Sequence, residues 1–316
     1  MRITCFCVGA AILGTAAFCS PIAAQEVARP VGMENRDTEQ DAVAQSELER
    51  RDPSQSNEIV VTGYRREEIR NHVYHVIDVD ADQLARREEP FCPRVVNFPS
   101  EYLPIIEQLI RESARKANVP LAAPDCLADA FAVFARDPQA FTEAIYDEYP
   151  SYFESLNRPE RRRMIAQQQP VYNWTLKVLR DNYGGTLPGD PPQISGVDIS
   201  RLTRNVRQDI EGTFIVIDID RTENMTLQQL ADFIFLNMVI EFKEGAREKS
   251  ANDSILHLFE FDDPLDAPQD MSPMDFALVE ALYAQPRNDR SARVQRGRIT
   301  DYIVTKLERE GLARDE

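Results

Sequence analysis

Residues 212–243 read GTFIVIDIDRTENMTLQQLADFIFLNMVIEFK. The first part, 212–220, is β-branched and almost uninterrupted by polar residues, which is typical of a strand buried on both faces. Residues 225–243 are strongly apolar over a length that suits a helix, and Thr226 is a preferred residue for its N-cap. The stretch therefore predicts a buried strand that leads directly into a buried helix.

Shorter patterns on both sides of this stretch predict further strands and helices. Period-two alternation or short apolar runs indicate strands, and apolar residues at helical spacing indicate helices. The expected strands are 58–65, 95–98, 131–135 and 171–179; the expected helices are 69–84, one starting at Ser100, 138–153, 272–283 and 291–310. Together they predict an α+β fold, with a mixed sheet and flanking helices.

The N-terminal region predicts export. Arg2 precedes an uncharged apolar run, 3–18, and small residues end the segment at Ala24, which is the pattern of a cleaved signal peptide over 1–24. The apolar run is shorter than a membrane-spanning helix requires. Residues 25–57 are polar, acidic and poor in large apolar residues, which predicts a disordered acidic linker. A single globular domain is expected over 58–312, in the periplasm or secreted.

The cysteines predict one disulfide. Cys5, Cys7 and Cys19 belong to the leader, so the mature chain keeps Cys92 and Cys126. A pair of cysteines in an oxidising compartment is expected to be bonded. The alternative is two free thiols, but no histidine lies near either cysteine in the sequence to stabilise a thiolate.

The charge balance bears on the partners. The chain has 53 acidic and 36 basic residues and a formal net charge of −17. Such a surface repels nucleic acid and anionic membranes, so neither is expected as a partner, and no membrane span is expected after signal cleavage. The cluster Arg158–Arg163 departs from this acidity; it is read as a solvated helical face, or as a patch for an anion or a protein.

Few residues suggest catalysis or metal binding. His72 and His75 are three residues apart, so a helix would place them on one face, and His257 is the only other histidine. These three are weak metal candidates, because no cysteine or acidic spacing reinforces them. No G-x-S-x-G elbow, glycine-rich phosphate loop or EF-hand loop is present. No cofactor is predicted.

The second half of the domain resembles a metzincin-type zinc peptidase. The resemblance lies in strand 213–219 leading into helix 226–243, in DSIL at 253–256, and in MSPMDFALVEALY at 271–283. It implies a zincin-like arrangement in which helix 226–243 occupies the place of the zinc-site helix. The HExxH signature of that family is absent; one alignment puts Ala231, Asp232 and Phe235 at its three positions. The resemblance therefore implies a scaffold without its metal site.

Two further resemblances concern the whole domain and its first strand. The pattern of EIVVTG, FCPRV at 91–95, QLADF at 229–233 and DSILHLF is similar to an uncharacterised family of exported alphaproteobacterial proteins. EIVVTGYR at 58–65 looks like the segment that begins the plug of TonB-dependent receptors.

These features predict an exported protein that is a non-catalytic binding or interaction domain with a degenerate metallopeptidase-like fold. Its expected partner is a protein or peptide of the cell envelope, held in a cleft along a sheet edge. Two alternatives stay open: an envelope hydrolase whose active site is scattered in the sequence, and an accessory of TonB-linked uptake.

Overall fold

The computed structural model describes residues 63–189, 192, 205–286 and 290–314. All of them belong to one compact unit, Val61–Glu316. The predicted signal peptide, the linker and residues 58–62 lie outside the described residues. No helix in the described part of the chain is both long and apolar enough to cross a membrane.

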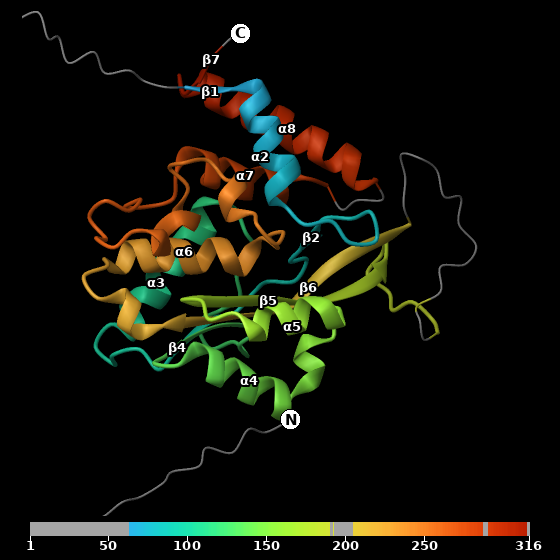
Figure 1. The fold of residues 1–316 in the computed structure, drawn as a ribbon. Helices are drawn as coiled ribbons and strands as arrows, with labels where there is room; N and C mark the ends of the chain where they lie inside the picture. The colour runs from blue at the N-terminus through green and yellow to red at the C-terminus, as the bar shows by residue number, and fades with distance from the viewer. Residues whose placement is uncertain (1–62, 190–191, 193–204, 287–289, 315–316) are drawn as a thin grey trace, which may run out of the picture. The chain divides into compact units, whose positions relative to one another are not determined.

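A mixed five-stranded sheet forms the centre of the unit (Figure 1). Its strands are β2 (Ala85–Arg86), β3 (Pro93–Val96), β4 (Ala130–Ala135), β5 (Val171–Asp181) and β6 (Val206–Asp218). The long strand β6 is its axis, because the second half of β6 pairs in parallel with β4 and its first half pairs in parallel with β2. Strand β3 continues the sheet beyond β4, again in parallel.

Strand β5 is the antiparallel strand of this sheet. It pairs with β6 from Val171↔Ile217 to Asp181↔Val206, with one register shift at Leu176/Lys177. No other described strand pairs with β5, so β5 is an edge strand. The sequence-predicted strands at 95–98, 131–135 and 171–179 all fall in this sheet.

Helices cover both faces of the sheet (Figure 1). On one face lie α3 (Leu103–Lys116) and α6 (Leu227–Val239), which share the large hydrophobic core with β4 and β6. On the other face lie α4 (Pro138–Glu148), the short helix η1 (Pro150–Phe153) and α5 (Arg158–Ala166). Their core is small and aromatic, built on Phe153, Tyr172, Trp174 and Val216.

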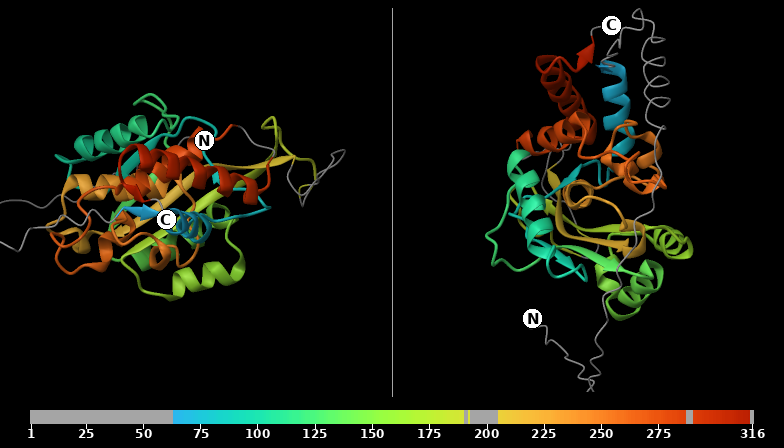
Figure 2. Two further views of the ribbon diagram at one scale, coloured as in Figure 1. Left: turned by 90° about the horizontal axis from the view of Figure 1, so that it is seen from above. Right: turned by 90° about the vertical axis from the view of Figure 1, so that its left-hand side faces the viewer.

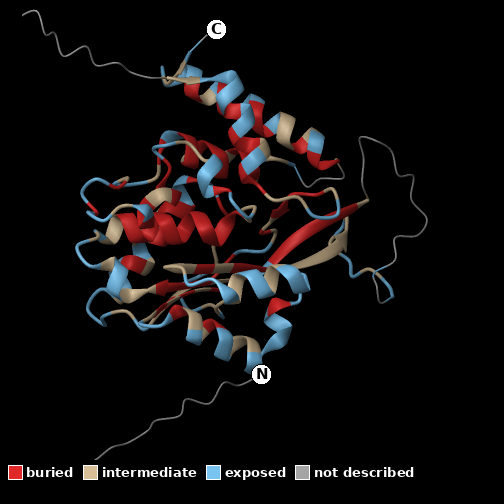
Figure 3. Ribbon diagram, in the orientation of Figure 1, coloured by how far each residue is buried: buried red, intermediate tan, exposed pale blue. Residues whose placement is uncertain are grey.

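Helix α6 is the most deeply buried helix of this arrangement (Figure 3). Every residue from Gln229 to Val239 is buried. Thr226 caps the helix as predicted: its hydroxyl accepts from the Gln229 N–H while the Gln229 side chain accepts from the Thr226 N–H. The strand-to-helix unit read from residues 212–243 is therefore the buried centre of the domain.

A further group of helices packs beyond α6. It contains α2 (Arg66–Val76), α7 (Pro273–Ala284) and α8 (Ala292–Arg309), and Figure 2 shows α2 and α8 side by side, away from the sheet. The short parallel pair β1 (Tyr64–Arg65) and β7 (Ala313–Arg314) joins the two ends of the described chain. Three 3-10 helices complete the elements: η2 (Ile219–Thr222), η3 (Arg247–Lys249) and η4 (Ile255–Glu260).

Several helix boundaries differ from the sequence prediction. The helix expected over 69–84 ends at Val76, because the backbone is extended from Ile77. The buried helix expected over 225–243 ends at Val239, because the backbone is extended at Ile240.

Two further boundaries differ because of proline. Helix α3 begins at Leu103 with Tyr102 as its N-cap, so the prediction of Ser100 as the cap is wrong; Pro104 sits in the first turn, where its fixed φ suits a helix start. The helix expected over 138–153 ends at Glu148, because Pro150 disfavours helical backbone at Tyr149.

Cys92 and Cys126 are bonded to each other, with Cα atoms 6.0 Å apart. Cys92 comes directly before β3, and Cys126 lies in the connection that leads to β4. The carbonyl of Cys92 also accepts from the N–H groups of Asp129 and Ala130. The predicted bridge thus ties the starts of two neighbouring parallel strands.

Candidate functional site

A cleft of about 640 Å³ opens beside the edge strand β5. Strand β5 forms one wall, and the segment from Ser155 to Gln169, which contains α5, forms the second. The C-terminal half of α6 and the loop 242–248 form the third, and residues 78–80 close one end. The cleft is thus built from four segments that lie far apart in the sequence.

Helix α6 presents one particular face to this cleft. Phe233 and Asn237 lie four residues apart on this face and line the cleft, and Glu241, which comes after the C-cap Ile240 and is not part of the helix, lines it as well. The Nδ2 of Asn173 on β5 donates to Oδ1 of Asn237 at 3.0 Å, which ties the helix to the edge strand. The Asn237 amide in turn donates to the carbonyl of Phe233 at 2.8 Å.

The positions suggested by the zinc-peptidase alignment lie on a different face of α6. Ala231 and Phe235 are completely buried in the core. Asp232 accepts from the Ser113 hydroxyl at 2.8 Å and from the Gln228 amide at 2.9 Å. None of these three residues lines the cleft. The face that does line it carries Phe233 and Asn237, which supply no imidazole or carboxylate for zinc, so these positions do not fit a zinc ion.

A buried ammonium group organises the closed end of the cleft. Lys177 Nζ lies 2.6 Å from Glu241, 3.4 Å from Asp80 and 3.8 Å from Asp78, and the Lys177 side chain is only 6% exposed. Burial raises the pKa of the Glu241 carboxyl to about 7, and the attraction of Lys177 acts in the opposite direction. Burial lowers the pKa of Lys177, but the surrounding carboxylates outweigh it and raise that pKa overall. Lys177 is therefore a fixed cation rather than a nucleophile.

The backbone of β5 offers hydrogen-bonding groups on its outer side. The Pro170 carbonyl accepts from Asp218 of β6, so by strand alternation the groups of Tyr172 and Trp174 also face β6. The groups of Val171, Asn173 and Thr175 then face away from β6; Val171 and Asn173 line the cleft, whereas Thr175 is buried. Lys177 also faces outward, and its N–H donates to the Ser155 hydroxyl at 2.7 Å.

The floor of the cleft region is held by a buried carboxylate. Leu256 of η4 lines the cleft, and Asp275 of α7 accepts from the Ser254 hydroxyl at 2.7 Å and from the Ile255 N–H at 2.8 Å. Burial raises the pKa of Asp275 to about 6, although these hydrogen bonds lower it. The segment DSIL, singled out in the sequence, is thus fastened to α7 next to α6.

The three histidines do not come together. His72 is buried in α2, His75 lies on the exposed side of α2, and His257 in η4 contacts the Ser250 hydroxyl at 2.9 Å and Glu260 at 2.6 Å. Among the described residues no group of three or more His, Cys, Asp or Glu side chains is arranged to hold a metal ion.

His72 is an unusual buried histidine. It is 4% exposed, and neither ring nitrogen has a hydrogen-bond partner within the described part of the chain. Burial lowers its pKa to about 4. His72 is therefore neutral in the folded protein at neutral pH.

We expect this histidine to weaken the fold in acid. Between about pH 6.5 and 4 the unfolded chain binds a proton that the folded chain does not, so the free energy of unfolding falls as the pH is lowered through this window, by on the order of 3 kcal/mol. His72→Leu removes this loss, which urea titrations at pH 7.5 and pH 4.5 measure. The control is His75→Leu on the same helix, which leaves the acid loss intact; an equal acid loss in His72→Leu would contradict the prediction.

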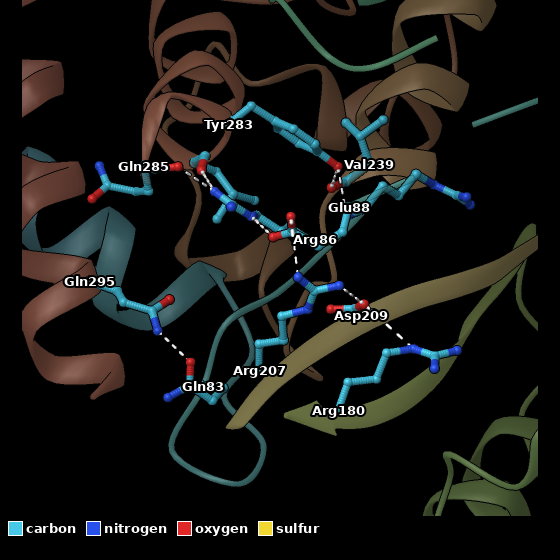
Figure 4. Close-up of polar contacts among 12 residues, drawn as sticks. Gln83, Arg86, Glu88, Arg180, Arg207, Asp209, Val239, Tyr283, Gln285 and Gln295 are labelled. Carbon is cyan, nitrogen blue, oxygen red and sulfur yellow. Dashed lines mark hydrogen bonds and ion pairs between the residues drawn. The ribbon is translucent and has the colours of Figure 1, made fainter. Parts of the chain in front are cut away.

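A second polar cluster lies where β2, β6 and α7 meet (Figure 4). Arg86 pairs with Glu88 at 2.5 Å and donates to the Gln285 carbonyl at 2.7 Å. Arg207 pairs with Asp209 at 2.8 Å. The cavity next to these groups measures about 10 Å³, which holds at most one water molecule. This cluster joins elements of the fold and does not provide room for a ligand.

The arginines of the cluster Arg158–Arg163 make different contacts. Arg163 forms a two-bond pair with Glu244, at 3.0 and 2.7 Å, and Arg161 lies 5.9 Å from the centre of the Tyr146 ring. Arg163 therefore reaches from α5 to the loop on the other side of the cleft.

Sequence reasoning missed Lys177 and Glu241. The only signal was for Glu241, a charged residue directly after the strongly apolar stretch 233–240. Comparison with known proteins finds no matching family model, no matching curated protein and no matching solved structure. The geometry itself is thus the basis for a functional proposal.

Proposed function

We propose that this protein is a non-catalytic peptide-binding domain of the cell envelope, which takes an extended peptide into the cleft beside β5. The observation that carries the proposal is the outward-facing backbone of an edge strand along the wall of a cleft of about 640 Å³. Extended peptides bind sheet edges in this way by adding a strand. Exposed edges are otherwise avoided in folded proteins, because they invite unwanted pairing.

The proposal includes a zincin-like scaffold that has lost its metal. A buried strand that leads into a buried helix beside an antiparallel edge strand supports this arrangement, together with DSIL and the α7 helix next to α6. Where such a scaffold would hold zinc, the cleft face of α6 carries Phe233 and Asn237. These side chains support binding of a peptide by packing and by amide hydrogen bonds rather than hydrolysis.

Charge complementarity favours a basic peptide. Asp78 and Asp80 are 33% and 51% exposed, and together with Glu241 they surround one ammonium group, that of Lys177. Lys243, which lines the cleft, and Arg296 also act on Asp78, so the preference rests on exposure rather than on a count of charges. Asp78 and Asp80 are the more exposed charges of this group, whereas the Lys177 side chain is only 6% exposed. A lysine or arginine of a bound peptide next to Asp78 and Asp80 would pair with these exposed carboxylates.

A proline substitution tests strand addition. Asn173→Pro removes an outward N–H without removing a hydrogen bond to β6, since proline is tolerated in edge strands where its nitrogen faces away from the sheet. The control is Asn173→Ala, which loses the same side chain but keeps the N–H. We expect Asn173→Pro to bind up to roughly tenfold more weakly than Asn173→Ala.

The measurement is fluorescence polarisation with a seven-residue peptide of alternating Lys and Val, next to its Glu and Val counterpart. The proposal predicts that the basic peptide binds more tightly than the acidic one. It also predicts that the basic peptide binds Asn173→Ala more tightly than Asn173→Pro. Equal affinity of both variants, with both folded by thermal melting, would sink strand addition at β5.

A further inference from the structure

We infer that the segment 154–167, here called the strap, is a gate over the cleft that is latched by the Arg163–Glu244 pair and opens to admit a ligand. This inference rests on the proposed function, because it describes how the same site is regulated.

The strap is anchored at its two ends and touches α4 and the aromatic core between them. At the first end the Ser155 hydroxyl bonds to the backbone of Lys177, and at the other end the Tyr172 hydroxyl donates to the Gln167 carbonyl at 2.7 Å. Between the ends the Gln139 amide donates to the Ile165 carbonyl at 2.8 Å, and Leu156 and Met164 are partly buried against the core. Helix α5 has no fully buried residue, whereas α6 across the cleft is buried along almost its whole length. Opening of the strap therefore costs less free energy than displacement of a core helix.

The latch joins opposite walls of the cleft. Arg163 lies on α5 and Glu244 lies on the loop after α6, and both residues line the cleft. The guanidinium donates to both carboxylate oxygens, which fixes the geometry of the contact. The two side chains are 49% and 71% exposed, and exposed pairs of this kind contribute little to stability. The pair therefore defines a closed position without locking it.

Ser155 occupies the place of an incoming strand. Its hydroxyl accepts from the Lys177 N–H at 2.7 Å and lies 3.4 Å from the Lys177 carbonyl, so it serves both outward groups of that residue. A peptide strand that extends along β5 past Asn173 and Thr175 must take these groups over from Ser155. Opening of the strap and strand addition at Lys177 are therefore coupled.

Hydrogen exchange of single backbone amides tests the gate without any peptide. In Glu244→Arg the latch becomes repulsive, and we expect the Lys177 amide to exchange up to roughly fivefold faster than in the unchanged protein. The matched control is the charge swap Arg163→Glu/Glu244→Arg, which restores an attractive pair and slow exchange. The Trp174 amide, which faces β6, should exchange equally in all three proteins.

Two results would overturn the gate. One is an unchanged Lys177 amide in Glu244→Arg; the other is an equal acceleration at Trp174, which would mean that the variant loosens the whole sheet. Binding of the alternating Lys and Val peptide is measured separately: its absence would count against the proposed function, while the exchange result would still decide whether the strap opens.

Discussion

Lys177→Met is expected to lower the free energy of unfolding by about 3–5 kcal/mol at pH 8, because it leaves the buried carboxylate of Glu241 without its cation. Glu241 is 14% exposed, and its nearest basic group is the ammonium 2.6 Å away. Asp78 and Asp80 are also carboxylates, so in the variant they repel the charge of Glu241 and do not neutralise it. Urea denaturation followed by tryptophan fluorescence measures the change, since Trp174 is buried on the same strand.

The pH dependence distinguishes this effect from a simple loss of packing. The folded pKa of Glu241 is already raised to about 7, and removal of Lys177 raises it further. A carboxyl whose pKa is higher in the folded than in the unfolded protein lowers the free energy of unfolding as the pH rises from the unfolded to the folded pKa. The stability difference between the unchanged protein and Lys177→Met should therefore grow from pH 6 to pH 8. The control Lys177→Met/Glu241→Gln should recover most of the stability. A loss that is the same at both pH values would contradict the electrostatic explanation.

Cys126→Ser is expected to lower the free energy of unfolding by about 4 kcal/mol under oxidising conditions, because the bridge closes a loop of 34 residues in the unfolded chain. One end of the bridge is buried, since Cys92 is 1% exposed and precedes β3 directly, whereas Cys126 is half-buried in the connection to β4. Thermal melting with and without reductant measures the effect. Reductant should lower the melting temperature of the unchanged protein and leave that of the variant alone.

Cys92→Ser is the matched control for the bridge. It removes the same cross-link from the unfolded chain, so it should lower the free energy of unfolding by about as much as Cys126→Ser does, apart from a small difference in local packing. If neither variant changes the melting temperature, the two cysteines do not stabilise the fold through their bond.

In the proposed function, a scaffold without metal ligands would serve as a binding domain. The edge of β5 would supply directional backbone groups, the exposed carboxylates near Lys177 would favour positive charge, and the strap would limit access. Each part is separately testable, because Asn173 and Glu244 lie outside the buried Lys177–Glu241 pair.

Local sequence patterns were enough to predict the types of most elements and their order. The apolar run 213–217 specifies a buried strand and the capping pair Thr226 and Gln229 starts α6, because both depend on neighbours within a few residues. The bridge between Cys92 and Cys126 was predicted without structural information, because the other three cysteines fall in the expected signal peptide and a remaining pair is expected to be bonded in an oxidising compartment.

The position of the cleft and its lining depend on tertiary packing. Polar residues are spread over several faces of α6, so its sequence does not tell which face meets the cleft. Packing buries Ala231 and Phe235 completely, while Phe233 and Asn237 line the cleft together with Glu241, which follows the helix. The Lys177–Glu241 and Arg163–Glu244 pairs join residues from segments far apart in the chain. Such contacts depend on the register of β5 against β6 and on the path of α5, which no local pattern encodes.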